Sequence, residues 1–210
     1  MTIQELPPID FVVISHNHYD HLDHKAVKEL GNKPLWVVPQ GHKSWFESCD
    51  ISNFVELGWW DQYPINDNVK VMALPCQHWS KRTAFDDFEA LWASWAIVGS
   101  KKVYFAGDTG YCDTFKEIGR EVGPFDLSFI PIGAYEPRDI MCPQHVDPDQ
   151  SVQIHVDIQS KKSVGMHWGT FILTDEHILE PPQKLAQAMQ QQGLPDDQFI
   201  VVKHGETSTN

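Results

Sequence analysis

The chain has 210 residues, of which 41% are hydrophobic and 21% charged, enough for one globular domain with a core. Its formal net charge of −13, without a cluster of lysine and arginine, argues against binding to nucleic acid or to an anionic membrane surface. No apolar run approaches the roughly eighteen residues of a membrane-spanning helix.

The N-terminal segment MTIQELPPID has neither the basic start nor the apolar centre of a secretory signal. The four cysteines lie far apart and fit free thiols in a reducing compartment. We therefore expect a protein that is cytoplasmic or peripheral to an intracellular membrane.

Short apolar runs rich in β-branched and aromatic residues predict strands. They lie at residues 11–14, 35–38, 69–74, 91–98, 103–106, 127–132, 163–166 and 199–202. Helices are predicted at residues 25–30, before Gly31, and at 182–192, before Gly193. A further helix runs to residue 157 from Asp147, an N-cap residue followed by a proline. Without repeats or linkers, the pattern indicates one α/β domain over residues 1–210.

Metal-ligating side chains gather directly behind the first apolar run, in the stretch ISHNHYDHLDH at residues 14–24. In an extended segment, residues two apart share a face, so His16 and His18 can point at one metal ion. Asp20 and His21 follow as the chain turns and can point at a second ion. Imidazole and carboxylate ligands suit zinc, and catalytic zinc takes three protein ligands and a water molecule. Neither set of ligands is complete here.

Three further candidate ligands each follow a predicted strand. His78 comes after residues 69–74, Asp108 after 103–106 and His167 after 163–166. Because each of them ends a strand and begins a loop, we expect all three to converge on one edge of the sheets.

The pattern H-x-H-x-D-H, with these three positions, resembles the metallo-β-lactamase superfamily. The resemblance implies an α/β fold of two β-sheets flanked by helices, an αββα sandwich that holds two zinc ions. It also implies the ligands of each ion. One zinc would be held by His16, His18 and His78 and the other by Asp20, His21 and His167, with Asp108 bridging both.

Longer stretches are similar to the N-acylphosphatidylethanolamine-hydrolysing phospholipase D family. They include QHWSKRT, FAGDTGYC, FDLSFIPIGAYEPR, QHVDPDQSVQIH and KSVGMHWGTFILTDEHILEPP. The resemblance implies a zinc-dependent phosphodiesterase that hydrolyses N-acylphosphatidylethanolamine-type phospholipids to N-acylethanolamine and phosphatidic acid. The partners it implies are a phospholipid substrate and a membrane contacted peripherally, and no nucleic acid.

The start of the chain departs from this family, in which several strands precede the H-x-H-x-D-H strand. Only fifteen residues precede His16 here. We therefore expect a domain that is N-terminally truncated relative to the family, with fewer strands in the first sheet than in the second. Unpaired strand edges invite association with another chain, so we expect a homodimer.

The mechanism implied by the resemblance is two-metal hydrolysis of a phosphodiester. Asp108 would hold the bridge and take a proton, while His145 or Lys81 would neutralise charge on a phosphoryl oxygen. Lys81 and Arg82 follow His78 closely, but two solvated charges beside a turn explain them equally well. His145 precedes a helix N-terminus, which favours anions, although a capping or surface histidine is the alternative.

Two other functions stay open at this stage. One is another hydrolase of the same fold, such as a sugar-phosphate lactonase or a nucleic-acid phosphodiesterase. The other is a non-catalytic zinc-binding fragment. The acidic balance weighs against nucleic acid, and GAYEPR with the C-terminal stretches favours the lipid enzyme.

Overall fold

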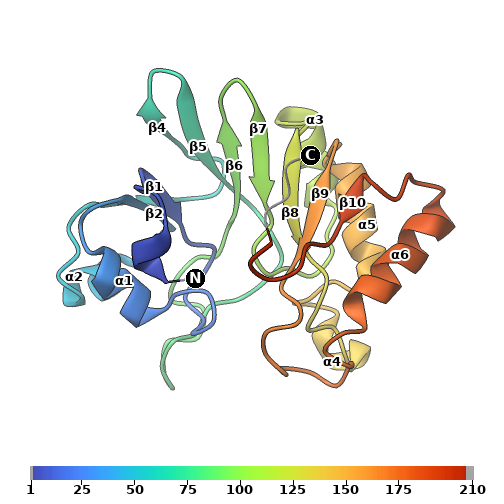
Figure 1. Ribbon diagram of the computed structural model, residues 1–210. Coiled ribbons are helices and arrows are strands. Elements are labelled where there is room, and N and C mark those ends of the chain that lie inside the picture. Colours follow the sequence, from blue (N-terminus) through green and yellow to red (C-terminus); the bar gives the residue numbers. More distant parts are fainter. Residues whose placement is uncertain (1, 207–210) are drawn as a thin grey trace.

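The computed structural model describes residues 2–206. Two β-sheets face each other and helices cover both outer sides, as Figure 1 shows. Over the described residues the first sheet holds three strands, in the order β1-β2-β3, and the second holds seven, in the order β10-β9-β8-β7-β6-β5-β4. The αββα sandwich is confirmed, and so is the smaller first sheet.

The first sheet is parallel, because a helix follows each of its first two strands and carries the chain back. In chain order, its part of the molecule comprises η1 (Ile3–Glu5), β1 (Phe11–Val13), α1 (His24–Leu30), β2 (Leu35–Pro39), α2 (Lys43–Ser48) and β3 (Phe54–Leu57). Helix α1 begins where the Asp23 side chain accepts hydrogen bonds from the backbone N–H groups of Lys25 and Ala26. It ends at Gly31, as predicted.

The second sheet is antiparallel on one side and parallel on the other. Its elements are β4 (Gln62–Asn66), β5 (Val69–Leu74), β6 (Ser94–Val98), β7 (Lys102–Phe105), α3 (Thr114–Glu121), β8 (Leu127–Pro131), α4 (Arg138–Met141), α5 (Pro148–Asp157), β9 (Ser163–Met166), α6 (Pro181–Gln192) and β10 (Phe199–Ile200). The predicted N-cap Asp147 of α5 accepts a hydrogen bond from the Gln150 N–H at 2.8 Å, and Gly193 ends α6.

Buried apolar side chains fill the spaces between the layers. Val37 and Leu57 of the first sheet pack with Val71 and Trp95 of the second. The Trp95 Nε1–H also donates to the Ile14 carbonyl at 3.0 Å. The two sheets are therefore joined by both packing and hydrogen bonding beside the segment that follows β1.

The directions of the strands bring the ends of four strands to one edge of the second sheet. Strands β5 and β7 are both antiparallel to β6, so they run in the same direction. Strands β8 and β9 are parallel to β7 and to each other. Because the carboxyl ends of β5, β7, β8 and β9 meet at this edge, the loops that follow them lie close together.

The sequence pattern misplaced one strand and missed several short elements. Strand β6 begins at Ser94 rather than at residue 91. Elements η1, α2, β3, β4, α3 and α4 were not predicted. Strand β4 is an edge strand with Pro64 inside it and alternates between exposed and half-buried residues. Among the described helices, none combines the length and the apolar character needed to cross a membrane.

Candidate metal centre

Three histidine rings meet where β1 and β5 end. The Nδ1 atom of His18 lies 2.9 Å from Nε2 of His16 and 3.3 Å from Nε2 of His78. Burial lowers the pKa of His16 and of His18, and it lowers the pKa of His78 to about 3. The three imidazoles are therefore neutral near pH 7, the form that binds a metal ion. We call them the first group.

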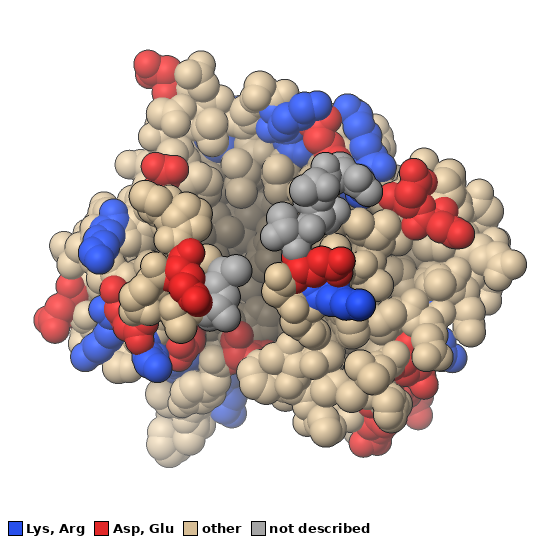
Figure 2. Space-filling model, in the orientation of Figure 1, with Lys and Arg blue, Asp and Glu red and all other residues tan. Residues whose placement is uncertain are grey.

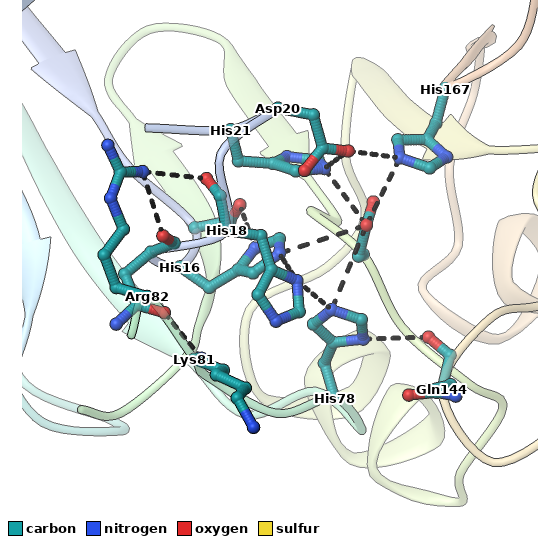
Figure 3. Close-up of polar contacts among 12 residues, drawn as sticks. His16, His18, Asp20, His21, His78, Lys81, Arg82, Gln144 and His167 are labelled. Atoms are coloured by element: carbon teal, nitrogen blue, oxygen red, sulfur yellow. Dashed lines mark hydrogen bonds and ion pairs between the residues drawn. The ribbon is translucent and has the colours of Figure 1, made fainter. Parts of the chain in front are cut away.

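A second group of ligand types lies beside the first (Figure 3). It consists of Asp20, His21 and His167, with Asp108 next to them. The Nε2 atom of His21 lies 3.2 Å from the Asp20 carboxylate, and that of His167 lies 3.5 Å from it. Although burial opposes protonation, Asp108 with Asp20 raises the pKa of His21 to about 9 and that of His167 to about 10. These carboxylates favour a cation, whether a proton or a metal ion.

The Asp108 carboxylate stands between the two groups. Its Oδ2 lies 4.0 Å from His16 Nε2 and 3.9 Å from His78 Nε2, and on the other side 3.0 Å from His21 Nε2 and 3.2 Å from His167 Nε2. The side chain is buried, and its Oδ1 has no hydrogen-bond partner in the described part of the chain. Burial disfavours this charge, but His167 and His21 keep the pKa of Asp108 well below its usual value. A buried carboxylate with a free oxygen between imidazoles fits a metal ligand.

Hydrogen bonds from outside orient two rings of the first group. The His78 Nδ1–H donates to the Gln144 carbonyl at 2.9 Å, and His16 Nδ1 lies 2.9 Å from the Ser15 hydroxyl. The first of these bonds leaves Nε2 of His78 without a proton and directed at the group. Glycine at position 107 allows the backbone before Asp108 to lie close to Ser15, because a Cβ there would come within 2.6 Å of the Ser15 side chain.

Arg82 braces the loop that carries His18, Asp20 and His21. Its Nη1 donates to the Leu22 carbonyl at 2.6 Å and to the Asn17 carbonyl at 3.2 Å, and its guanidinium lies 4.2 Å above the Tyr19 ring. This position of Arg82 could not be predicted from the sequence, because the residues next to Arg82 in the chain carry no signal for hydrogen bonds to these distant carbonyls.

The structure brings His145 to the centre and does not bring Lys81. The His145 ring lies 5.2 Å from that of His78 and 5.6 Å from that of His167, and a ring nitrogen falls within reach of the same ion as His78 and Asp108. Burial lowers the pKa of His145 to about 4. The Lys81 Nζ instead pairs with Asp87 at 2.7 Å and points away from the histidines in Figure 3.

A cavity of about 260 Å³ opens beside the second group. Asp20, His21 and His167 line it together with Gly133 and Ala134 of the loop after β8, and most of the other lining residues belong to the loop after β9. In that loop Phe171, Ile172 and Leu173 are 60%, 82% and 55% exposed. Apolar side chains therefore line part of a cavity that adjoins a strongly polar centre.

Comparisons with known proteins give the relatives of this chain. A family model described as "Beta-lactamase superfamily domain" matches residues 2–168. The chain is 43% identical to "N-acyl-phosphatidylethanolamine-hydrolyzing phospholipase D 1" of Caenorhabditis elegans, over 98% of this chain and 62% of that protein. It is 36% identical to "N-acyl-phosphatidylethanolamine-hydrolyzing phospholipase D, mitochondrial" of Saccharomyces cerevisiae, over 92% of this chain and 43% of that protein. The chain thus spans less than two thirds of the length of either relative.

Solved structures share the fold. An isothiocyanate hydrolase from Delia radicum gut bacteria matches with a TM-score of 0.79 at 18% identity, over 100% of this chain and 80% of that one. A metallo hydrolase from the archaeon Ignicoccus hospitalis matches with a TM-score of 0.74 at 21% identity, over 95% of this chain and 78% of that one. These likenesses establish the fold.

Proposed function

Because this chain belongs to the beta-lactamase superfamily, we propose that it is a hydrolase with two zinc ions that acts on N-acylphosphatidylethanolamine-type phospholipids. The products would be an N-acylethanolamine and phosphatidic acid. The observation that carries the proposal is the cavity that Asp20, His21 and His167 share with the apolar residues Phe171, Ile172 and Leu173, since it offers a hydrocarbon chain a place next to the polar centre. The names of the C. elegans and yeast relatives support the same substrate class.

The two groups would divide the zinc ions between them. His16, His18 and His78 would hold one, and Asp20, His21 and His167 would hold the other, with Asp108 shared. Bound zinc would supply Lewis-acid polarisation of a phosphoryl oxygen and would lower the pKa of water. Asp108 has an oxygen without a hydrogen-bond partner among the described residues, so it can take up the proton that water releases on attacking phosphorus. His145, as a neutral imidazole, can donate a hydrogen bond to a phosphoryl oxygen.

Exposed apolar side chains on both rims of the centre support contact with a lipid surface. Phe85 is 93% exposed and Phe88 64% exposed in the loop between β5 and β6, and Ile172 is exposed in the loop after β9. Both loops hang from the lower side of the molecule in Figure 1. On the face drawn in Figure 2, basic and acidic side chains are interspersed, and the lysines at residues 101 and 161 pair with Asp126. A neutral or zwitterionic lipid surface therefore suits the protein better than an anionic one.

The proposal is tested by incubating the zinc-loaded chain with N-acylphosphatidylethanolamine in phosphatidylcholine vesicles. Mass spectrometry should find N-acylethanolamine and phosphatidic acid in equal amounts, and a chelator should abolish both. Sugar-phosphate lactones and cyclic nucleotides are assayed in parallel.

Faster turnover of a lactone or a cyclic nucleotide would reject the lipid substrate and leave another hydrolase of this fold. A chain that binds zinc and hydrolyses none of these substrates, nor bis(p-nitrophenyl) phosphate, would be a non-catalytic metal-binding protein.

A further inference from the structure

Two loops that border the cavity are tied together by one carboxylate. Glu176, in the loop after β9, accepts a hydrogen bond from the Ala134 N–H at 2.7 Å on one oxygen. Its other oxygen accepts one from the Glu136 N–H at 3.0 Å. Both donors belong to the loop after β8, in the stretch GAYEPR, and Glu176 itself belongs to TDEHILEPP. The two stretches that marked the family resemblance therefore bind each other.

The contact between the two loops extends on both sides of Glu176. The Tyr135 hydroxyl donates to the Glu180 carboxylate at 2.7 Å, and the Asp175 N–H donates to the Glu136 carbonyl at 3.3 Å. Gly133, in the loop after β8, packs closely against His167 at the start of the loop after β9. A Cβ at Gly133 would come within 2.3 Å of the His167 carbonyl. The loop after β9 is thus hydrogen-bonded to the loop after β8 at several positions.

The fastened segment is the wall of the cavity. Phe171, Ile172 and Leu173 lie between His167 and Glu176, so the chain is held at a metal-ligand position on one side and by the carboxylate on the other. The three side chains are largely exposed and make little core packing that would hold the wall by itself. The wall is therefore held at its C-terminal end by the two hydrogen bonds of the Glu176 carboxylate together with the backbone bond of Asp175.

We propose that Glu176 is a positioning residue that fixes the Phe171–Leu173 wall and thereby sets the affinity for the apolar arm of the substrate. The inference rests on the lipid substrate proposed above. It gives Glu176 no part in the attack on phosphorus, because both carboxylate oxygens are engaged by backbone N–H groups. Substrate binding and the chemical step should consequently respond to this residue separately.

The substitution Glu176→Gln tests substrate binding separately from the chemical step, and it hardly changes the volume of the side chain. A carboxylate can accept both hydrogen bonds, whereas an amide offers one oxygen and one NH₂ group, which faces a backbone N–H as donor to donor. The matched control is Asp175→Asn, which removes the same charge from the neighbouring residue. Asp175 is exposed and joins the other loop through its backbone N–H, which this substitution keeps.

The experiment compares the unaltered chain with both variants, each loaded with zinc. Glu176→Gln should raise KM for N-acylphosphatidylethanolamine about tenfold at unchanged kcat, the factor expected from losing one hydrogen bond to a charged acceptor. It should leave kcat/KM for bis(p-nitrophenyl) phosphate and the zinc content unchanged. Chymotrypsin should cut the variant faster after Phe171 or Leu173. Asp175→Asn should match the unaltered chain in every measurement.

Equal losses on both substrates would overturn the proposal, because Glu176 would then act through the metal centre. Unchanged KM and unchanged cleavage would overturn it as well. If the unaltered chain hydrolyses the small phosphodiester and not the lipid, the proposed substrate fails while the role of Glu176 is still decided. In that case faster chymotryptic cleavage, with faster hydrogen exchange at the Ala134 and Glu136 amides, supports the tie, and unchanged rates reject it.

Discussion

Three neutral imidazoles meet on one side of Asp108, whereas two imidazoles and a carboxylate meet on the other. Rings of the first group are oriented from outside, by the Ser15 hydroxyl and the Gln144 carbonyl. Rings of the second group face Asp20 and Asp108 and are held by charge. The difference teaches that one half of the centre is shaped by hydrogen bonds and the other by ion pairing, so the two halves should respond differently to mutation and to pH.

The largest effect should come from removing what the two groups share. Asp108→Asn keeps the volume but removes the charge that faces four histidines, so both groups should bind metal more weakly. Hydrolysis of bis(p-nitrophenyl) phosphate should fall by at least about 100-fold. Metal analysis and initial rates measure the two effects. Asp113→Asn is the control, since Asp113 pairs with Lys116 at the surface, and retained turnover in Asp108→Asn would show that Asp108 does not join the groups.

A second prediction separates the groups by pH. In the metal-free chain His21 and His167 keep protons up to about pH 9 and about pH 10, so a metal ion must displace those protons at neutral pH. The affinity of the second group for a metal ion should therefore fall about tenfold for each unit by which the pH is lowered, for each proton displaced. The pKa of the first-group rings is lowered, to about 3 for His78, so that group displaces none near neutrality.

Lowering the pH from about 8 to about 6 at limiting zinc should therefore empty the second group first. Zinc analysis after equilibration measures the occupancy, and visible spectra of a cobalt-substituted sample show which site changes. Parallel loss from both sites would contradict the distinction between the two groups.

The smallest effect should come from one orienting bond. Ser15→Ala removes the hydroxyl beside His16 Nδ1, so it should weaken metal binding at the first group by about tenfold and leave the second group unchanged. Competition with a chelator measures both affinities. Ser48→Ala, which removes a surface hydroxyl bonded to the Trp45 carbonyl, should change neither. If Ser15→Ala weakened both groups equally, the two would be one coupled unit.

The gathering of these histidines and aspartates could be predicted from the sequence because its signals are local. His16, His18, Asp20 and His21 lie within six residues, and the remaining ligands each follow an apolar strand whose end is readable. Strands β5, β7, β8 and β9 run in the same direction, so their carboxyl ends meet at one edge of the sheet. No detail of side-chain packing is needed to predict this. The assignment of each ligand to a particular zinc ion stays a prediction, as does the homodimer.

Contacts between distant loops were out of reach. Lys81 was placed near phosphate because it lies three residues from His78, but the turn that follows directs it to Asp87. Glu176 and Ala134 are 42 residues apart, and no spacing rule connects a carboxylate with backbone N–H groups at that separation. Strand β4 was missed for another reason, since its place at the sheet edge is set by pairing with β5 rather than by its own apolar content.

The candidate metal ligands run from residue 16 to residue 167 and follow strands of both sheets. Contacts that close such long loops form slowly, because the chain loses conformational entropy before it gains the energy of the contact. We therefore expect the centre to be assembled late in folding, together with the contacts between the sheets, so that a bound ion adds little to the folding rate. Its effect falls on unfolding, which must first pull the two sheets away from a shared ion. Metal supply would govern how long a folded molecule lasts rather than how fast it forms.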